Sequence, residues 1–328
     1  MNVGRRGLFR HVAIAATLAV TGTLAFAQAY PSKPIRIIVP YSAGGVTDQI
    51  ARLLANSLSQ RLGQSVFVEN RPGGNTVPAS QFIAKAPADG YTLYVNTPSS
   101  WSINVAYYRN LPYGRNDYTA IAMTSEIPLG LMVPADSPFK TLSDLVEFAR
   151  ANPDKIANGS AGALTQGQLG MEILKATTGV TILNVPYQGN APAMVALLGG
   201  QVQVVLTDIA SGAQHVQAGK MRILAVNTEK RLASFPNVPT IAEAGFGNVK
   251  ILSPWNGVFG PPGMPTDIVD KLNTEINSIM QSPEGLRFLA GASLLPTVHS
   301  PQKAKAMVQT DYDTYVPLLA KLGLKSSD

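Results

Sequence analysis

The sequence alternates between short apolar strand patterns and amphipathic helical patterns, and this alternation constrains the fold more than any other feature. Ile35-Arg36-Ile37-Ile38-Val39 is typical of a buried strand, and apolar residues at helical spacing follow from Ile50 to Leu62. Further strand patterns lie at residues 66–68, 91–95, 129–133, 182–185, 202–207 and 223–226. Strands joined through helices usually lie parallel, so the pattern predicts α/β sheets with parallel pairing.

The alternation occurs in two halves, and a chain of 328 residues is long enough for two cores. Helices are predicted at residues 142–151 and after Pro261. Pro128 and the segment Ser253-Pro254-Trp255 are the candidate crossings between two domains. If the C-terminal segment returns to the first domain, two connecting strands result, which suits hinge closure. We predict one domain from residues 28–129 with 254–328, and a second from residues 130–253.

The first 27 residues have the pattern of a cleaved export signal. Arg5, Arg6 and Arg10 supply positive charge, an apolar run follows at residues 12–20, and Ala25-Phe26-Ala27 is a small-x-small cleavage site. A membrane helix is the alternative, but the run is too short for one. We therefore predict a signal peptide at residues 1–27 and a periplasmic location. Ordinary secretion and twin-arginine export both fit this segment.

The charge of the chain changes once this segment is set aside. The whole sequence carries 26 basic and 20 acidic residues, for a net charge of +6. The signal segment holds three arginines and no acid, so 23 basic residues remain against 20 acidic ones, a net +3. No basic run with interleaved aromatic residues occurs, so nucleic-acid binding is not expected. The absence of cysteine excludes disulfides, thiolate metal sites and cysteine nucleophiles.

Two Gly-rich loops, one in each half, carry the strongest chemical signal. Residues 41–48 and 159–166 each combine glycines with hydroxyl side chains just before a helix. Unpaired N–H groups at a helix N-terminus attract anions, and glycine lets an anion approach closely. Neither residues 40–51 nor residues 156–174 contain lysine or arginine. An anion would therefore be held by amides and hydroxyls. Tight turns without a ligand are the alternative, which two matched loops disfavour.

Other candidate site residues follow predicted strands. Asp208 comes after the apolar segment 204–206, at the strand end where α/β proteins bind ligands. It could accept hydrogen bonds from a ligand or cap the next helix, and both interpretations stay open. Ser99 and Ser100 follow the third strand and are expected to line the cleft. Trp101 either joins them or is a buried structural residue. Asp48 is expected mainly to favour the first helical turn.

Enzyme signatures are weak. Ser137-Pro138-Phe139-Lys140 matches the Ser-x-x-Lys of penicillin-binding proteins, but the proline and the missing Lys-Thr-Gly element favour a turn before a helix. His215 and His299 are the histidines after residue 27, and no Gly-x-Ser-x-Gly elbow accompanies them. His215 is expected to be a surface or packing residue. No metal-ligand spacing occurs, so we predict no catalytic residue, no metal and no cofactor.

Several sequence blocks, spread in order over the chain after residue 29, resemble one known family. The chain is similar to the periplasmic solute-binding proteins of tripartite tricarboxylate transporters, called the Bug family. The blocks are residues 30–35, 41–48, 68–74, 88–92, 185–187, 197–202 and 235–240.

The resemblance implies a two-domain periplasmic binding protein of the Venus flytrap, type II-like class, with each domain an α/β sheet flanked by helices. It implies that a small di- or tricarboxylate or an aromatic acid binds between the two loops, partly through bridging waters. The expected partners are the large and small membrane subunits of a transporter, and a membrane sensor kinase is the alternative. A monomer without enzymatic activity is expected.

Sequence pattern and resemblance together predict a set of ligand-binding residues. The family usually has glycine where this chain has Leu164, and commonly histidine where it has Gln168. Leu164 is therefore expected to place an apolar side chain at the cleft and to favour ligands with an apolar or aromatic body. The predicted residues are Tyr41, Ser42, Ala43, Gly44, Gly45, Thr47, Ser99, Ser100, Ser160, Ala161, Gly162, Leu164, Thr165, Gln166, Tyr187 and Asp208.

Overall fold

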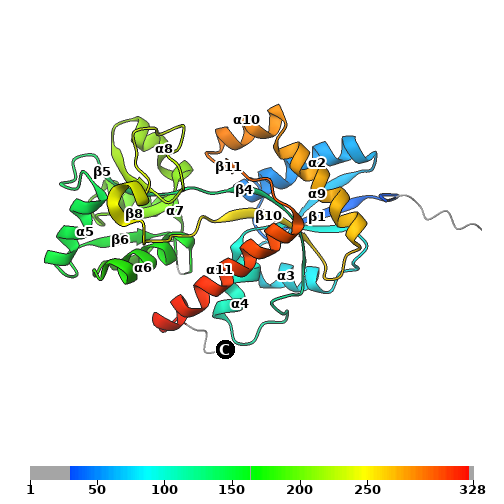
Figure 1. Ribbon diagram of the computed structural model, residues 1–328, viewed down its shortest axis with the longest axis horizontal. Coiled ribbons are helices and arrows are strands. Elements are labelled where there is room, and N and C mark those ends of the chain that lie inside the picture. The colour runs from blue at the N-terminus through cyan, green and yellow to red at the C-terminus, as the bar shows by residue number, and fades with distance from the viewer. Residues whose placement is uncertain (1–29, 163, 325–328) are drawn as a thin grey trace, which may run out of the picture.

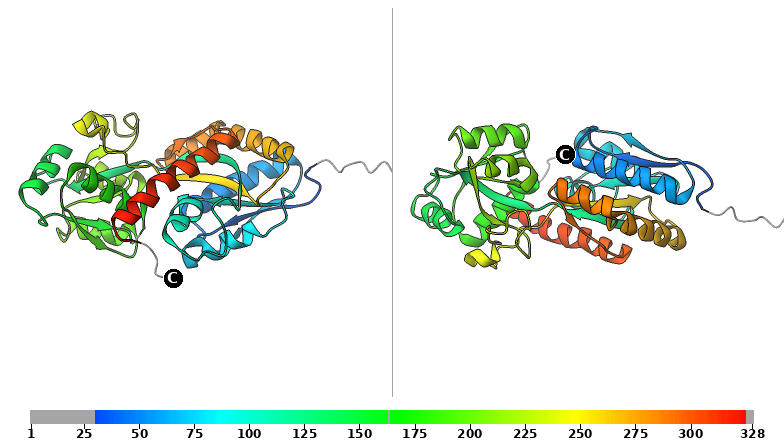
Figure 2. Two further views of the ribbon diagram at one scale, coloured as in Figure 1. Left: turned by 60° about the horizontal axis from the view of Figure 1, so that its bottom comes forward. Right: turned by 90° about the horizontal axis from the view of Figure 1, so that it is seen from above.

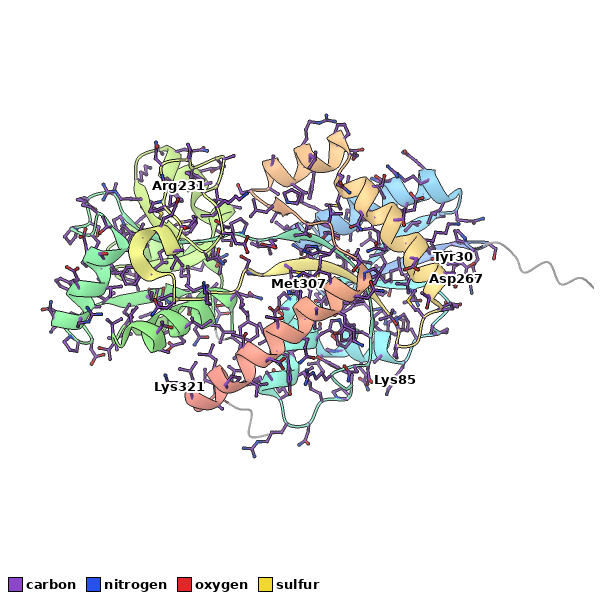
Figure 3. The ribbon with its side chains drawn as sticks, in the orientation of Figure 1. Tyr30, Lys85, Arg231, Asp267, Met307 and Lys321 are labelled. Atoms are coloured by element: carbon purple, nitrogen blue, oxygen red, sulfur yellow. The ribbon has the colours of Figure 1, made fainter. Side chains whose placement is uncertain are left out.

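A computed structural model describes residues 30–162 and 164–324, which form two lobes lying side by side (Figure 1). The predicted signal peptide, residues 1–27, lies outside the described residues. Tyr30 and Asp267 lie at the end of the first lobe that faces away from the second, whereas Arg231 lies in the second lobe (Figure 3). Within the described ranges, no helix has both the length and the apolar character needed to span a membrane.

The first lobe is built on a mixed sheet with strand order β11-β4-β10-β3-β1-β2. Its strands are β1 (Ile35–Val39), β2 (Val66–Asn70), β3 (Thr92–Asn96), β4 (Thr119–Glu126), β10 (Trp255–Gly260) and β11 (Leu295–Pro296). Its helices are α2 (Val46–Leu62), α3 (Val77–Ala84), α4 (Asn104–Tyr107), α9 (Thr266–Met280), α10 (Pro283–Gly291) and α11 (Pro301–Lys321). Short helical turns lie at η1 (Gly74–Thr76) and η2 (Ser99–Ile103).

Helices cover this sheet on both faces, which explains why β1 is apolar at every position except Arg36. Ile35, Ile37 and Val39 alternate to one face, where they pack with apolar residues of α2 and α9. Ile38 points to the opposite face, in a cluster with α3 and α11. These β1 side chains are fully buried. Burial on both faces fixes the position of β1, and with it the loop that follows at Tyr41.

The second lobe has a three-stranded sheet, β8-β5-β9, and the parallel pair β6-β7. The N–H of Gly159 donates to the carbonyl of Val204 at 3.0 Å, so β6 is hydrogen-bonded to the segment that leads into β8. The strands are β5 (Leu129–Pro134), β6 (Ala157–Ser160), β7 (Leu183–Pro186), β8 (Val205–Asp208) and β9 (Met221–Val226). The helices are α5 (Leu142–Ala151), α6 (Gln166–Thr178), α7 (Asn190–Leu198) and α8 (Ile209–Gln217), with a short turn at η3 (Ala242–Phe246).

The predicted parallel pairing is found for some strands and not for others. β1 pairs in parallel with β2 and β3, but β10 pairs antiparallel with β3 and β4. In the second lobe β5 lies antiparallel to both β8 and β9. The reason is the path of the chain: β4 runs toward the second lobe and β10 returns from it, so the two neighbours have opposite directions (Figure 1).

The chain passes between the lobes at two adjacent segments. β4 ends at Glu126 and β5 begins at Leu129, while β10 begins at Trp255. The N–H of Ile127 donates to the carbonyl of Pro254 at 2.7 Å, so the two crossings are hydrogen-bonded to each other. This supports the predicted crossings at Pro128 and at residues 253–255. The domain limits at residues 129 and 254 remain our proposal.

Helix α11 provides a third link between the lobes. Tyr315, Leu318 and Leu319 near its C-terminus pack in one apolar cluster with Ile103 of the first lobe and Leu169 of α6 in the second. The views in Figure 2 show this helix running along the first lobe toward the second. Movement of one lobe relative to the other therefore has to deform or slide this cluster.

Candidate functional site

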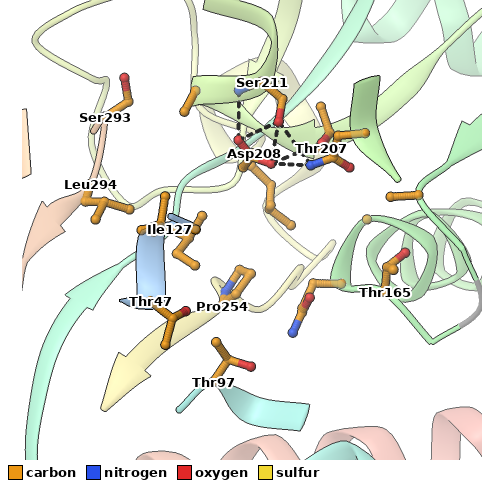
Figure 4. Close-up of a pocket in the computed structure, with 18 of the residues that line it drawn as sticks. Thr47, Thr97, Ile127, Thr165, Thr207, Asp208, Ser211, Pro254, Ser293 and Leu294 are labelled. Carbon is orange, nitrogen blue, oxygen red and sulfur yellow. Dashed lines mark hydrogen bonds between the residues drawn. The ribbon is translucent and has the colours of Figure 1, made fainter. Parts of the chain in front are cut away.

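A cavity of about 700 Å³ lies between the two lobes, beside the crossings (Figure 4). In Figure 4, Thr47 and Thr97 of the first lobe lie on one side, Asp208 and Ser211 of the second on the other, and Pro254 of a crossing between them. Its lining residues are Tyr41, Gly45, Val46, Thr47, Thr97, Ser99, Ile127, Leu129, Ala161, Thr165, Gln166, Gly167, Asn190, Leu206, Thr207, Asp208, Ala210, Ser211, Pro254, Ala292, Ser293 and Leu294.

The first Gly-rich loop brings the N-terminus of α2 to the cavity. Gly45 is the residue before the helix, and no side chain caps it. Gly45, Val46 and Thr47 line the cavity. The Thr47 hydroxyl donates to Asn256 Oδ1 at 2.9 Å, which ties the helix start to β10. The first N–H groups of α2 are therefore available to a ligand, with the partial positive charge of the helix behind them.

Asp48 holds this loop in place. Its side chain is 1% exposed and accepts hydrogen bonds from the Gly44 N–H, Arg52 Nε and Asn70 Nδ2, each at 2.8 Å. Burial by itself raises the pKa of Asp48, but the bonds from Arg52, Gly44 and Asn70 outweigh it and hold the pKa below its ordinary value. Asp48 therefore braces the loop in addition to favouring the first helical turn.

Asp48→Asn is expected to lower the free energy of unfolding by about 2 kcal/mol at pH 7, because Arg52 and Gly44 lose a charged acceptor. The folded-state pKa is depressed, so this contribution is present above the pKa of the unfolded chain. It disappears as the pH falls through the folded value. Urea unfolding at pH 7 and pH 3 measures the loss of stability and its dependence on pH. Asp267→Asn, an exposed acid in the first turn of α9, is the control and should change little. Equal changes in the free energy of unfolding of the two variants at pH 7 would contradict the role of Asp48 in holding the loop.

The second Gly-rich loop brings the N-terminus of α6 to the same cavity. The Thr165 hydroxyl accepts from the Gln168 N–H at 3.5 Å and donates to the Gly162 carbonyl at 2.9 Å. Gln168 Oε1 in turn accepts from the Leu164 N–H at 2.7 Å. Thr165 therefore caps α6, and Gln168 holds the residue before the cap. Thr165, Gln166 and Gly167 line the cavity from this side.

Tyr41 supplies a hydroxyl to the first-lobe wall. Its Oη lies 2.6 Å from Thr97 Oγ1, and either atom can donate. Burial raises the pKa of Tyr41 above its ordinary value, against the opposing hydrogen bonds from Thr97 and Ser99. The phenol is therefore neutral at physiological pH and does not repel an anion.

Asp208 closes the second-lobe wall at the start of α8. Its Oδ1 accepts from the Ser211 N–H at 2.8 Å, so it caps the helix. Oδ2 accepts from Asn190 Nδ2 at 2.6 Å and from Ser211 Oγ at 2.8 Å. Of the two interpretations left open by the sequence, the cap is observed, and the residue also lines the cavity. Among the lining residues, Asp208 and Tyr41 are the ionisable ones, and neither lysine nor arginine is present.

Half of the predicted site residues meet at this cavity. They are Tyr41, Gly45, Thr47, Ser99, Ala161, Thr165, Gln166 and Asp208. Ser42, Ala43 and Gly44 lie in the exposed part of the first loop and do not line it. Gly162 also lies outside the lining, where its carbonyl accepts the Thr165 hydroxyl.

Ser100, Ser160 and Tyr187 do not line the cavity either, and their assignment to the lining is corrected. Ser100 is buried, with its hydroxyl bonded to Ser80, Thr76 and Tyr94. Ser160 is buried as well, and Tyr187 packs in an apolar cluster of the second lobe. Trp101 is fully buried and stacks on Tyr118, so of its two interpretations the structural one is observed.

Leu164 does not form an apolar wall of the cavity, contrary to the prediction. It has a φ of +61°, in the left-handed region that strains residues with a side chain. Its side chain packs against the apolar cluster of Ile103, Leu169 and Tyr315. That contact compensates for the strain and belongs to the link between lobes. Leu164 therefore gives no reason to expect an aromatic ligand.

Several lining residues were missed by sequence reasoning. Ile127 and Pro254 belong to the crossings, and a crossing beside the cleft could have been a signal for them. Asn190 and Ser211 are polar residues in the first turns of α7 and α8, a position that could have marked them. Residues 292–294 follow α10 and reach the cavity only through tertiary packing.

Ser137, Lys140 and His215 take no part in the cavity. Lys140 Nζ donates to the Ser137 carbonyl at 2.6 Å, and Thr141 caps α5, so the predicted turn before a helix is confirmed. His215 lies on α8 and is partly buried there. In the described part of the chain, no three His, Asp or Glu side chains are grouped as a metal site would need.

A two-lobed α/β fold with a cavity at the junction of the lobes defines a class, the solute-binding receptors of the Venus flytrap type. Residues 50–324 match the family described as "Tripartite tricarboxylate transporter family receptor". The chain therefore belongs to this family of periplasmic solute-binding receptors, and the resemblance read from the sequence is confirmed.

Individual relatives cover nearly the whole chain. BugT of Bordetella pertussis is 32% identical over 301 residues, which is 91% of this chain and 92% of BugT. The structure of Rpa4515 from R. palustris with adipate is 33% identical, with a TM-score of 0.76, and the match covers 90% of this chain and 99% of that one. MatC from Rhodopseudomonas palustris with bound malate is 27% identical, with a TM-score of 0.72, over 88% of this chain and 100% of MatC.

Proposed function

We propose that this receptor captures a small carboxylate between its lobes and delivers it to the large and small membrane subunits of a tripartite tricarboxylate transporter. The observation that carries the proposal is the junction cavity, where the starts of α2 and α6 meet without a cationic side chain. The adipate and malate bound to two structural relatives support a carboxylate ligand. We further propose export by the segment 1–27 and a monomeric receptor.

Closure follows from contacts that a ligand makes with both lobes. The N–H groups of Val46 and Thr47 bind a carboxylate oxygen from the first lobe, whereas Thr165 and Gly167 bind one from the second lobe. A ligand that makes both sets of contacts binds the closed form better than the open form, and only such differential affinity shifts the equilibrium. The paired crossings at Ile127 and Pro254 provide the hinge.

A thermal-shift screen of purified protein tests the proposed ligand class. Carboxylates such as adipate and malate should raise the melting temperature in a concentration-dependent way, because they bind the folded state. A sugar and a nucleobase serve as comparison compounds and should give no shift. No response to any carboxylate, together with a shift from a comparison compound, would refute the proposal.

Val46→Pro is expected to weaken carboxylate binding at least tenfold, or about 1.4 kcal/mol. Proline fits the first position of a helix and keeps its geometry, but it removes one N–H that faces the ligand. Gly45 before it has φ −71° and ψ 164°, which a following proline tolerates. Isothermal titration calorimetry with the best carboxylate of the screen measures the loss.

Two matched variants isolate the N–H group. Val46→Ala removes the side chain but keeps the N–H, so its affinity should fall less than threefold. Thr266→Pro places proline at the same position of α9, away from the cavity, and should leave binding unchanged. If Val46→Ala loses as much affinity as Val46→Pro, the side chain and not the amide holds the ligand.

A further inference from the structure

The second-lobe wall of the cavity differs in polarity from the first. Asn190, Thr207, Asp208 and Ser211 all line it, and Asp208 lies at the centre of their hydrogen bonds (Figure 4). A deprotonated carboxylate only accepts hydrogen bonds, so every neighbour bonded to Asp208 has to turn a proton toward it.

The protons of these side chains can be counted. Asn190 Nδ2 has two, which go to Asp208 Oδ2 at 2.6 Å and Ser211 Oγ at 3.0 Å. Ser211 has one hydroxyl proton, and Oγ lies 2.9 and 2.8 Å from the two Asp208 oxygens. Thr207 Oγ1 donates to Asp208 Oδ2 at 3.4 Å. All these side-chain protons are therefore used within the cluster: one Asn190 proton points at Ser211 Oγ, and the others point at the carboxylate.

Among the side chains of this cluster, the atoms left for a ligand are acceptors. Asn190 Oδ1 receives no hydrogen bond from the described residues, and Ser211 Oγ keeps a lone pair after accepting from Asn190. Gln166 and Ser293, which also line the cavity, can rotate to donate or accept and so favour neither. The side chains fixed by Asp208 thus favour a hydrogen-bond donor opposite them.

The helix starts show the same asymmetry. In α8 the N–H of Ile209 donates to the Pro128 carbonyl at 3.0 Å, and the N–H of Ser211 donates to Asp208. Of the first three N–H groups, the one of Ala210 is left for a ligand. In α2 no side chain caps the first turn, and the same is true of α7, so the contrast is between α2 and the capped helix α8 beside Asp208. An anionic group is favoured at α2 and disfavoured beside the Asp208 carboxylate, because like charges repel at contact distance.

We propose that the receptor selects a carboxylate whose far end carries a hydrogen-bond donor, such as an ammonium, amide or hydroxyl group, over a plain dianion. This rests on the proposed function, because the ligand carboxylate is assigned to the α2 and α6 corners. Asn190 and Ser211 contact the donor, and Asp208 acts as a positioning residue that orients both side chains and adds negative charge.

Calorimetric titration at pH 7.5 with two matched series of compounds tests the inference. The six-carbon series is hexanoate, adipate, adipic acid monoamide and 6-aminohexanoate; the four-carbon series is butyrate, succinate, succinamate and 4-aminobutyrate. In at least one series, a donor-bearing compound should bind at least tenfold more tightly than both the dianion and the unsubstituted acid. If the dianion or the unsubstituted acid binds as tightly or more tightly in every series that binds, the inference is wrong although the proposed function stands. Failure of all eight compounds contradicts the proposed function itself.

Variants connect the preference to these side chains. Asp208→Asn supplies an amide that can donate as well as accept, so the donor-to-dianion affinity ratio should fall at least fivefold. Ser211→Ala keeps the carboxylate cap through the main-chain N–H and should lower the same ratio about threefold, which covers the case that Asp208→Asn folds poorly. Asp154→Asn and Ser234→Ala, exposed in the second lobe, are the controls and should leave the ratio unchanged. An unchanged ratio in Ser211→Ala and in folded Asp208→Asn would overturn the assignment.

Discussion

Asp311→Asn is expected to raise the free energy of unfolding at pH 8 by a few kcal/mol and to leave it nearly unchanged at pH 4. Asp311 lies on α11, is 5% exposed and accepts a hydrogen bond from Trp255 Nε1 at 2.7 Å. Burial raises the pKa of Asp311 to about 7, against the opposing hydrogen bond from Trp255.

The direction of the pH effect follows from proton linkage. The folded protein holds this proton up to a pH of about 7, whereas the unfolded chain releases it near 3.8. The stabilisation from the bound proton is complete below the unfolded value and is lost as the pH rises through the folded one. Asparagine stays neutral and can still accept from Trp255, so it avoids the buried charge.

Urea unfolding of wild type and variant between pH 4 and pH 8 measures this difference. Using the difference between the two proteins removes the contribution of the other titrating groups. Asp313→Asn is the control, because Asp313 lies on the same helix but is exposed. A difference that stays constant across this pH range would show that Asp311 does not titrate there.

Gly167→Ala is expected to lower the free energy of unfolding by about 3 kcal/mol and to reduce ligand affinity. Gly167 lies in the first turn of α6, where an added Cβ would collide with the backbone carbonyl of Leu206 in β8. A backbone atom cannot move aside as a flexible side chain can. The start of α6 would therefore be pushed away from β8, and its N–H groups would leave their position at the cavity.

Thermal unfolding and calorimetric titration together check both parts of this expectation. For a chain of this size, the predicted loss corresponds to a fall in melting temperature of roughly 5 °C. Gly291→Ala is the matched control, because Gly291 ends α10 with open space around it. A Gly167→Ala protein as stable as the control would mean that α6 and β8 are not in such close contact.

Local patterns predicted the central strands and several helices well, because a strand buried on both faces is apolar at nearly every position. The run at Ile35–Val39 matches β1, and the amphipathic segment at residues 142–151 matches α5. β10 was missed because Gly257 interrupts its apolar residues and Gly260 ends them, and glycines are typical of turns in sequence. β4 was missed although it pairs along most of its length with β10, a partner distant in sequence.

The two corners of the site were predictable from sequence, whereas the rest of the cavity was not. Glycines and hydroxyl residues before a helix mark an anion-accepting N-terminus locally, so Gly45, Thr47 and Thr165 could be named in advance. The Asn190–Asp208–Ser211 cluster joins the starts of two helices. Because its polarity depends on which side chains share hydrogen bonds, it emerges only when α7 and α8 lie side by side.

The sequence by itself determined the alternation of strands and helices, the family, and an anion-binding character that relies on backbone amides in place of cations. These follow from local chemistry: apolar periodicity, glycine before helices and the absence of lysine and arginine from both loops. The tertiary structure alone decided the antiparallel partners of β10, the turning of Leu164 toward α11, and the acceptor-rich wall around Asp208. Each of these depends on contacts between residues far apart in the chain, for which a local pattern carries no signal.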